Sequence, residues 1–127
     1  MARMQTPLRQ VRGLGSAKDG TAHFWRVRVT SVALVPLSLF VIGLLVSLGG
    51  ASYDEVRAVL ARPVVTVLFG LFVVISLDHM RSGMEEVIQD YVHGELAKVV
   101  FLMLNLFFIV VVGAASVFAL LKIAFGG

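Results

Sequence analysis

The chain has 127 residues, of which 58% are hydrophobic and only 15% are charged, so it is far more apolar than an ordinary water-soluble domain. It contains no cysteine, which excludes disulfide bonds, a thiolate-ligated iron–sulfur cluster and covalently attached haem. The net charge of +3 gives no indication of nucleic-acid binding, because most of the basic residues lie in the N-terminal segment.

Residues 1–28 are predicted to form a polar, basic N-terminal arm, either solvated or bound to a partner. It has one acidic residue, Asp19, and its basic residues are Arg3, Arg9, Arg12, Lys18, Arg26 and Arg28. The first loop after the first apolar run carries only Arg57 and Arg62. The positive-inside rule therefore predicts that the N-terminal arm is cytoplasmic.

Three long apolar runs follow, and they predict membrane spans at about residues 29–49, 63–84 and 98–124. Pro36 is expected to kink the first span, whereas Pro63 suits the first turn of the second. Residues 64–77 are shorter than the roughly 20 residues that a span needs, so the second span must extend through the polar residues that follow. We expect residues 52–57, between these spans, to form a brief interfacial turn. The sequence therefore predicts an all-α membrane protein in which residues 29–127 form a three-helix transmembrane anchor.

The second span ends in a cluster of ionisable residues, which are costly within a membrane and mark functional sites by default. His79, Gly83, Glu86 and Asp90 follow at i, i+4, i+7 and i+11, so an unbroken helix would place them along one face. On this spacing His79 and Asp90 lie about 16 Å apart along the helix axis.

This separation suggests two different sites on one helix. His79, within the membrane, could ligate haem iron through a neutral imidazole, and Gly83 would let a flat macrocycle approach the backbone. Asp90 and Tyr91, near the cytoplasmic interface, could relay protons to a quinone and donate a hydrogen bond to its carbonyl. The alternatives are a hydrogen-bonded structural histidine and an ordinary interfacial belt of acidic and aromatic residues.

The remaining polar residues near this cluster have simpler interpretations. Glu85, Glu86 and Glu95 are interpreted as solvated interfacial charges, and His93 as an ordinary surface histidine. Several polar groups within apolar spans also predict a partner, because such groups need partners in hydrocarbon.

Two stretches resemble the smaller hydrophobic membrane-anchor subunits of succinate dehydrogenase, the respiratory complex II. The first is His79-x-x-x-Gly83-Met84 followed by Asp90-Tyr91-Val92. The second leads into the first span and reads Gly20-Thr21-Ala22-His23-Phe24-Trp25-Arg26-Val27-Arg28-Val29-Thr30. The number and order of spans also fit, so the resemblance covers nearly the whole chain.

The resemblance implies a four-subunit complex in which a flavoprotein subunit carrying FAD oxidises succinate and an iron–sulfur subunit passes the electrons to the membrane. This chain would form part of a helical bundle with a second anchor subunit and would catalyse nothing alone. His79 would be one axial ligand of haem b, with the second histidine from the other anchor. Tyr91 and Asp90 would bind ubiquinone, and Arg28 and Arg81 are candidates for pairing with a haem propionate.

Other readings of the same residues remain open at this point. The chain could be the anchor of a fumarate reductase, or a small proton-conducting or transporter subunit in which Asp78, His79 and Arg81 form a relay. We expect a bacterial inner membrane, with the mitochondrial inner membrane as the alternative because the arginine-rich arm resembles a transit peptide.

Overall fold

The computed structural model describes residues 6–8 and 19–126 of the chain. Within that part, the elements run in the order α2 (Asp19–Ser47), α3 (Tyr53–Leu60), α4 (Pro63–Tyr91) and α5 (Glu95–Ala124). Three of these helices, α2, α4 and α5, are long and apolar enough to cross a membrane. The predicted all-α membrane protein with three spanning helices is therefore confirmed.

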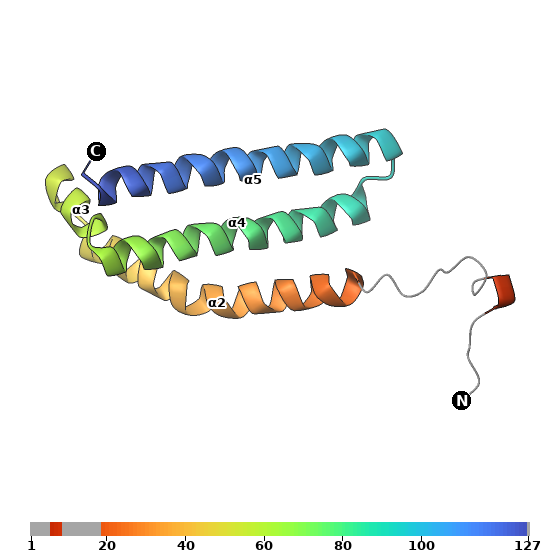
Figure 1. Ribbon diagram of the computed structural model, residues 1–127, viewed down its shortest axis with the longest axis horizontal. Helices are drawn as coiled ribbons and strands as arrows, with labels where there is room; N and C mark the ends of the chain where they lie inside the picture. Colours follow the sequence, from red (N-terminus) through yellow and green to blue (C-terminus); the bar gives the residue numbers. More distant parts are fainter. Residues whose placement is uncertain (1–5, 9–18, 127) are drawn as a thin grey trace, which may run out of the picture.

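The long helices lie side by side in one layer with α4 in the middle (Figure 1). Over the described residues α4 packs against both α2 and α5, whereas α2 and α5 do not touch each other. Successive helices run in opposite directions, so the start of α2, the end of α4 and the start of α5 share one end of the layer (Figure 1). The site described below lies towards this end.

Two helices extend beyond the apolar runs that predict the spans. α2 begins at Asp19, so residues 19–28 of the predicted arm are helical, and its early turns are tied to α4 by side-chain bonds. α4 continues to Tyr91, which makes the polar cluster a direct extension of the spanning helix. The arm residues Arg3, Arg9, Arg12 and Lys18 lie outside the described residues.

Proline acts differently in the two helices. Pro36 lies inside α2, where it removes one backbone hydrogen bond, and α2 bends along its length in Figure 1. Pro63 is the first residue of α4, where its missing N–H has no intrahelical partner to lose.

The segment expected to form an interfacial turn is instead the helix α3, which begins with a capping box. The Ser52 hydroxyl accepts a bond from the Glu55 backbone N–H at 3.4 Å, and the Glu55 carboxylate accepts one from the Ser52 N–H at 2.7 Å. These bonds from Ser52, the backbone bond foremost, favour the ionised carboxylate and lower the pKa of Glu55 below its ordinary value. α3 covers the end of the layer opposite the polar cluster (Figure 1).

The described residues bury very little within the chain itself. The buried side chains are the apolar Val41, Ile88 and Leu120 and the polar Ser82. Most large apolar side chains on the long helices are exposed, and only lipid or another protein chain can cover them in a membrane. The single open layer is thus suited to be one part of a larger helical assembly.

Candidate functional site

His79 lies on α4 at a position where α2 passes beside it. Its Nδ1 atom is 3.0 Å from the hydroxyl oxygen of Thr30 on α2, and both side chains are partly buried. The other ring nitrogen, Nε2, has no hydrogen-bond partner among the described residues. The imidazole is therefore held on one side and available on the other, which is the arrangement that a histidine ligand requires.

Asp78, the residue before His79, forms an ion pair with Arg26 of α2. The Arg26 Nε donates to Asp78 Oδ2 at 2.9 Å, and a terminal guanidinium nitrogen of Arg26 bonds Oδ1. Two parallel bonds of this kind fix geometry as well as charge. The pair sets how α2 and α4 align beside His79.

Arg81 is bonded within α4 rather than to Asp78 or His79. Its Nε donates to Glu85 Oε1 at 2.8 Å, and its backbone carbonyl accepts a bond from the Asn105 side-chain amide of α5 at 3.1 Å. Because Asp78 is held by Arg26 and Arg81 by Glu85, the described residues contain no Asp78–His79–Arg81 chain of hydrogen bonds. The interpretation of Glu85 as a solvated charge is wrong, since it pairs with Arg81 one helical turn away.

The face formed by His79, Gly83, Glu86 and Asp90 is continuous, because α4 is helical from Pro63 to Tyr91. Glu86 on this face lies 2.8 Å from His23 Nε2 of α2, a third side-chain contact between α2 and α4, and one that was not predicted from the sequence. A methyl group added at Gly83 would meet no atom within 4 Å. Space therefore remains open beside the chain one turn from His79.

Asp90 and Tyr91 end α4 and are both exposed, Tyr91 by 77%. Neither side chain makes a hydrogen bond to a described residue. Close to them, the start of α2 and the end of α4 form an open hollow of about 330 Å³, lined by Gly20, His23, Glu85, Glu86 and Gln89. This end of the layer thus presents two exposed polar side chains next to an open hollow whose lining includes His23, Glu85 and Glu86.

Arg28 lies apart from these contacts. Its guanidinium carbon sits 4.2 Å from the centre of the Phe24 ring, one turn earlier on α2. It also lines a groove of about 360 Å³ formed by α2 residues alone, namely Trp25, Arg28, Val29, Val32 and Ala33. Arg28 and Thr30 are two residues apart, so they stand on different sides of α2, and the structure does not bring Arg28 to His79.

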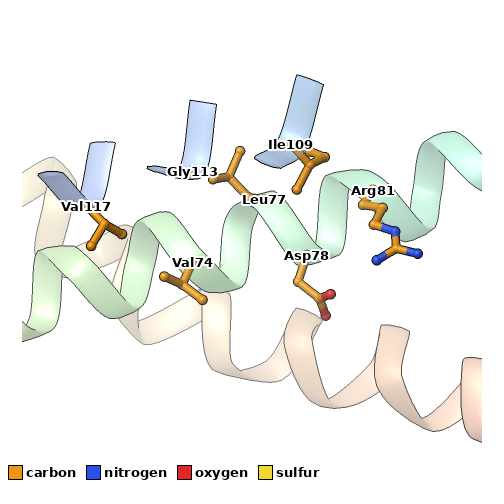
Figure 2. A pocket seen from close by; sticks show the side chains of 7 residues that line it. All are labelled: Val74, Leu77, Asp78, Arg81, Ile109, Gly113 and Val117. Atoms are coloured by element: carbon orange, nitrogen blue, oxygen red, sulfur yellow. The ribbon is translucent and has the colours of Figure 1, made fainter. Parts of the chain in front are cut away.

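A further groove of about 250 Å³ lies where α4 meets α5 (Figure 2). Its lining is apolar, namely Val74, Leu77, Ile109, Gly113 and Val117, except at the end formed by Asp78 and Arg81. Figure 2 shows the Asp78 carboxylate turned away from α5 towards α2, where it meets Arg26. Gly113 lets α5 come close here, since a methyl group at that position would lie 3.3 Å from a methyl carbon of Leu77.

The polar residues of α4 could be identified from the sequence, but their partners on α2 could not. Thr30, Arg26 and His23 were visible as polar residues before or within an apolar run, and Arg26 and Thr30 are four apart on one face. That spacing indicates a polar face on α2. It does not indicate which residues of α4 this face meets, because the periodicity of one helix does not define its alignment with another.

Comparison with known proteins identifies the chain's relatives. Residues 2–121 match the family described as the succinate dehydrogenase/fumarate reductase transmembrane subunit. The chain is 32% identical to the succinate dehydrogenase hydrophobic membrane anchor subunit of Paracoccus denitrificans over 95% of this chain and 93% of that protein. It is 34% identical to the membrane anchor subunit of Reclinomonas americana over 65% of this chain and 72% of the relative. No solved structure matches the chain.

Proposed function

We propose that this chain, which belongs to the succinate dehydrogenase/fumarate reductase transmembrane-subunit family, holds one side of a b-type haem and part of a ubiquinone site. The chain is a membrane-anchor component of succinate dehydrogenase. As an anchor it is a component of an enzyme complex. The observation that carries the proposal is the hydrogen bonding of His79, which lies in a membrane-spanning helix. Its Nδ1 is hydrogen-bonded to Thr30, and its Nε2 has no hydrogen-bond partner among the described residues.

The residues around His79 fit a haem. An axial ligand needs an unprotonated ring nitrogen pointing into space that a macrocycle can occupy, and Gly83 leaves such space one turn along the same face. Bound haem would supply a one-electron carrier within the membrane. In this proposal His79 would bind the haem iron from this chain, and a histidine of a second anchor subunit would be the other protein ligand.

Arg28 and Arg81 are the proposed partners of the haem propionates, with Arg28 as the better candidate. The Arg28 guanidinium forms no ion pair with a described residue, whereas Arg81 is bonded to Glu85. The Arg28 groove is lined by α2 alone and lies on another side of α2 from Thr30, so only a haem that extends from His79 around α2 could place a propionate there.

Tyr91 and Asp90 are the proposed quinone-binding residues. The Tyr91 hydroxyl would donate a hydrogen bond to a quinone carbonyl, and the Asp90 carboxylate would orient the ring or deliver protons as the quinone is reduced. Both residues are exposed and without hydrogen-bond partners in the described part of the chain, which leaves them available at the membrane surface.

The proposed partners are a second anchor subunit, an iron–sulfur subunit and a flavoprotein subunit. The open layer of helices supports this, because its exposed apolar faces need cover beyond what the chain supplies. The protein is a membrane protein, and we place it in a bacterial inner membrane with the N-terminus cytoplasmic. This orientation puts Asp90 and Tyr91 on the side from which a cytoplasmic iron–sulfur subunit would deliver electrons.

The alternative of a proton relay through Asp78, His79 and Arg81 gains no support from the contacts, since Asp78 and Arg81 are bonded to other residues. Haem content per flavin in the purified complex tests the proposal directly. His79→Ala should lower this ratio strongly, and an unaltered ratio would overturn the ligand assignment.

A further inference from the structure

The Thr30 hydroxyl has three close neighbours, and together they determine where its proton lies. Its oxygen is 2.8 Å from the Arg26 carbonyl oxygen, 3.0 Å from the Val27 carbonyl oxygen and 3.0 Å from His79 Nδ1. Carbonyl oxygens can only accept hydrogen bonds, whereas a hydroxyl has one proton to donate and two lone pairs that accept.

For a neutral imidazole, only one tautomer is compatible with these contacts. If the hydroxyl donated to His79, its lone pairs would face two carbonyl oxygens at hydrogen-bond distance with no proton between them. If its proton is shared between the two backbone carbonyl oxygens in a three-centre bond, the hydroxyl accepts from a protonated Nδ1 of His79, and no contact joins two acceptors. Two acceptor oxygens that face each other without a proton between them are costly in a partly buried site within a membrane, because little water is there to supply the missing hydrogen bond.

We propose that Thr30 is a positioning residue that fixes His79 with its proton on Nδ1 and its lone pair on Nε2, directed at the haem iron. This inference rests on the proposed function of His79 as a haem ligand. Through one hydrogen bond, Thr30 selects the tautomer, orients the ring and makes Nε2 more basic.

The position of Thr30 makes the haem site depend on how α2 aligns with α4. The Arg26 carbonyl accepts the Thr30 proton, while the Arg26 side chain pairs with Asp78, the neighbour of His79. His23 and Glu86 make a further contact between the same helices nearer the end of α4. α2 is therefore inferred to take part in building the site, although its apolar faces alone suggest only an anchor.

The test compares Thr30→Val, which keeps the side-chain shape but removes the hydroxyl, with Thr30→Ser, which keeps the hydroxyl. Both are made in the complete purified complex. Thr30→Val should accelerate haem transfer to apomyoglobin by roughly 10-fold or more, because loss of the hydrogen bond that holds a metal-bound histidine typically weakens metal binding by about 10- to 100-fold. It should also raise the haem midpoint potential and shift the g-values of the ferric haem, because a less basic ligand stabilises Fe(III) less well.

Thr30→Ser should remain close to the native protein in all three measurements. Ser31→Ala is the matched control, because Ser31 bonds the Val27 carbonyl at 2.7 Å in the same way but does not touch His79. If the valine variant does not assemble, Thr30→Ala, which is smaller and removes the same hydroxyl, replaces it.

The outcomes separate this inference from the proposal on which it rests. Native haem transfer, potential and g-values in the variant without a hydroxyl would overturn the role of Thr30, while loss of haem in His79→Ala would leave the ligand assignment intact. Retention of native haem in His79→Ala would instead remove the proposed function.

Discussion

Arg26 on α2 and Asp78 on α4 form a two-point ion pair immediately beside His79, with Arg26 Nε 2.9 Å from Asp78 Oδ2. Both residues lie in helices long enough to span the membrane, and their side chains are 50% and 27% exposed in the isolated chain. An assembled complex in a membrane would shield them further from water. The pair is therefore positioned to hold the alignment on which the contact between Thr30 and His79 depends.

Removing one member of this pair should destabilise the complex more than removing both. Arg26→Leu or Asp78→Leu alone should each cost about 1.5–3 kcal/mol of stability, because each leaves an unpaired charge in an apolar setting. The double variant leaves no unpaired charge and should therefore cost less stability than either single variant. Thermal unfolding of the purified complex measures this, and strictly additive losses would show that the two residues act independently.

Gly83 should be required for haem binding but not for folding of the chain. A Cβ atom at Gly83 would meet no neighbouring atom within 4 Å, and leucine is a better helix former than glycine by up to about 1 kcal/mol, so Gly83→Leu should not destabilise α4 itself. The new side chain would enter the space proposed for the macrocycle, and haem per flavin should fall. Gly43→Leu, on α2 with equally open surroundings, is the control. Full haem content in Gly83→Leu would argue against the placement of the macrocycle.

Tyr91→Phe should slow quinone reduction by roughly 10-fold, since the loss of one hydrogen bond to the reacting quinone costs about 1–1.5 kcal/mol. Succinate oxidation with a soluble dye and the haem spectrum should both be unchanged. Tyr53→Phe is the control, because Tyr53 is also 77% exposed but lies on α3, at the opposite end of the layer. Equal quinone reduction in the two variants would exclude a role for the Tyr91 hydroxyl.

The capping box of α3 should make this helix sensitive to acid. The pKa of Glu55 is lowered by its bonds from Ser52, so the stabilisation is present above the ordinary pKa of a glutamate and is lost as the pH falls through the lowered value. Amide hydrogen exchange in α3, corrected for intrinsic rates, should show less protection on acidification. Glu55→Gln should abolish this change specifically in α3. The same pH dependence in the variant would assign it to another group.

The spans and the polar face of α4 could be predicted from sequence because both depend on local properties. Apolar length sets the spans, and the spacing of His79, Gly83, Glu86 and Asp90 needs only an unbroken helix. α3 was also within reach, because Ser52 and Glu55 have the capping-box spacing that starts a helix. Only a turn was expected at residues 52–57.

The contacts between helices could not be predicted in this way. Thr30 meets His79 and Arg26 meets Asp78 because α2 and α4 pack antiparallel in one particular alignment, which a periodic pattern in a single helix does not define. The role of Glu85 was misjudged for a related reason. Its spacing of four from Arg81 permits a pair, but whether the two side chains meet depends on their surroundings.

The most direct test of the account is the dithionite-reduced minus oxidised absorption spectrum of the purified complex with His79→Ala. His93→Ala is a suitable control, because His93 follows the end of α4 and is exposed. The account predicts that the b-type haem signal is lost or strongly perturbed in His79→Ala and unchanged in His93→Ala. A native spectrum in His79→Ala would contradict it and would return His79 to a structural role between α2 and α4.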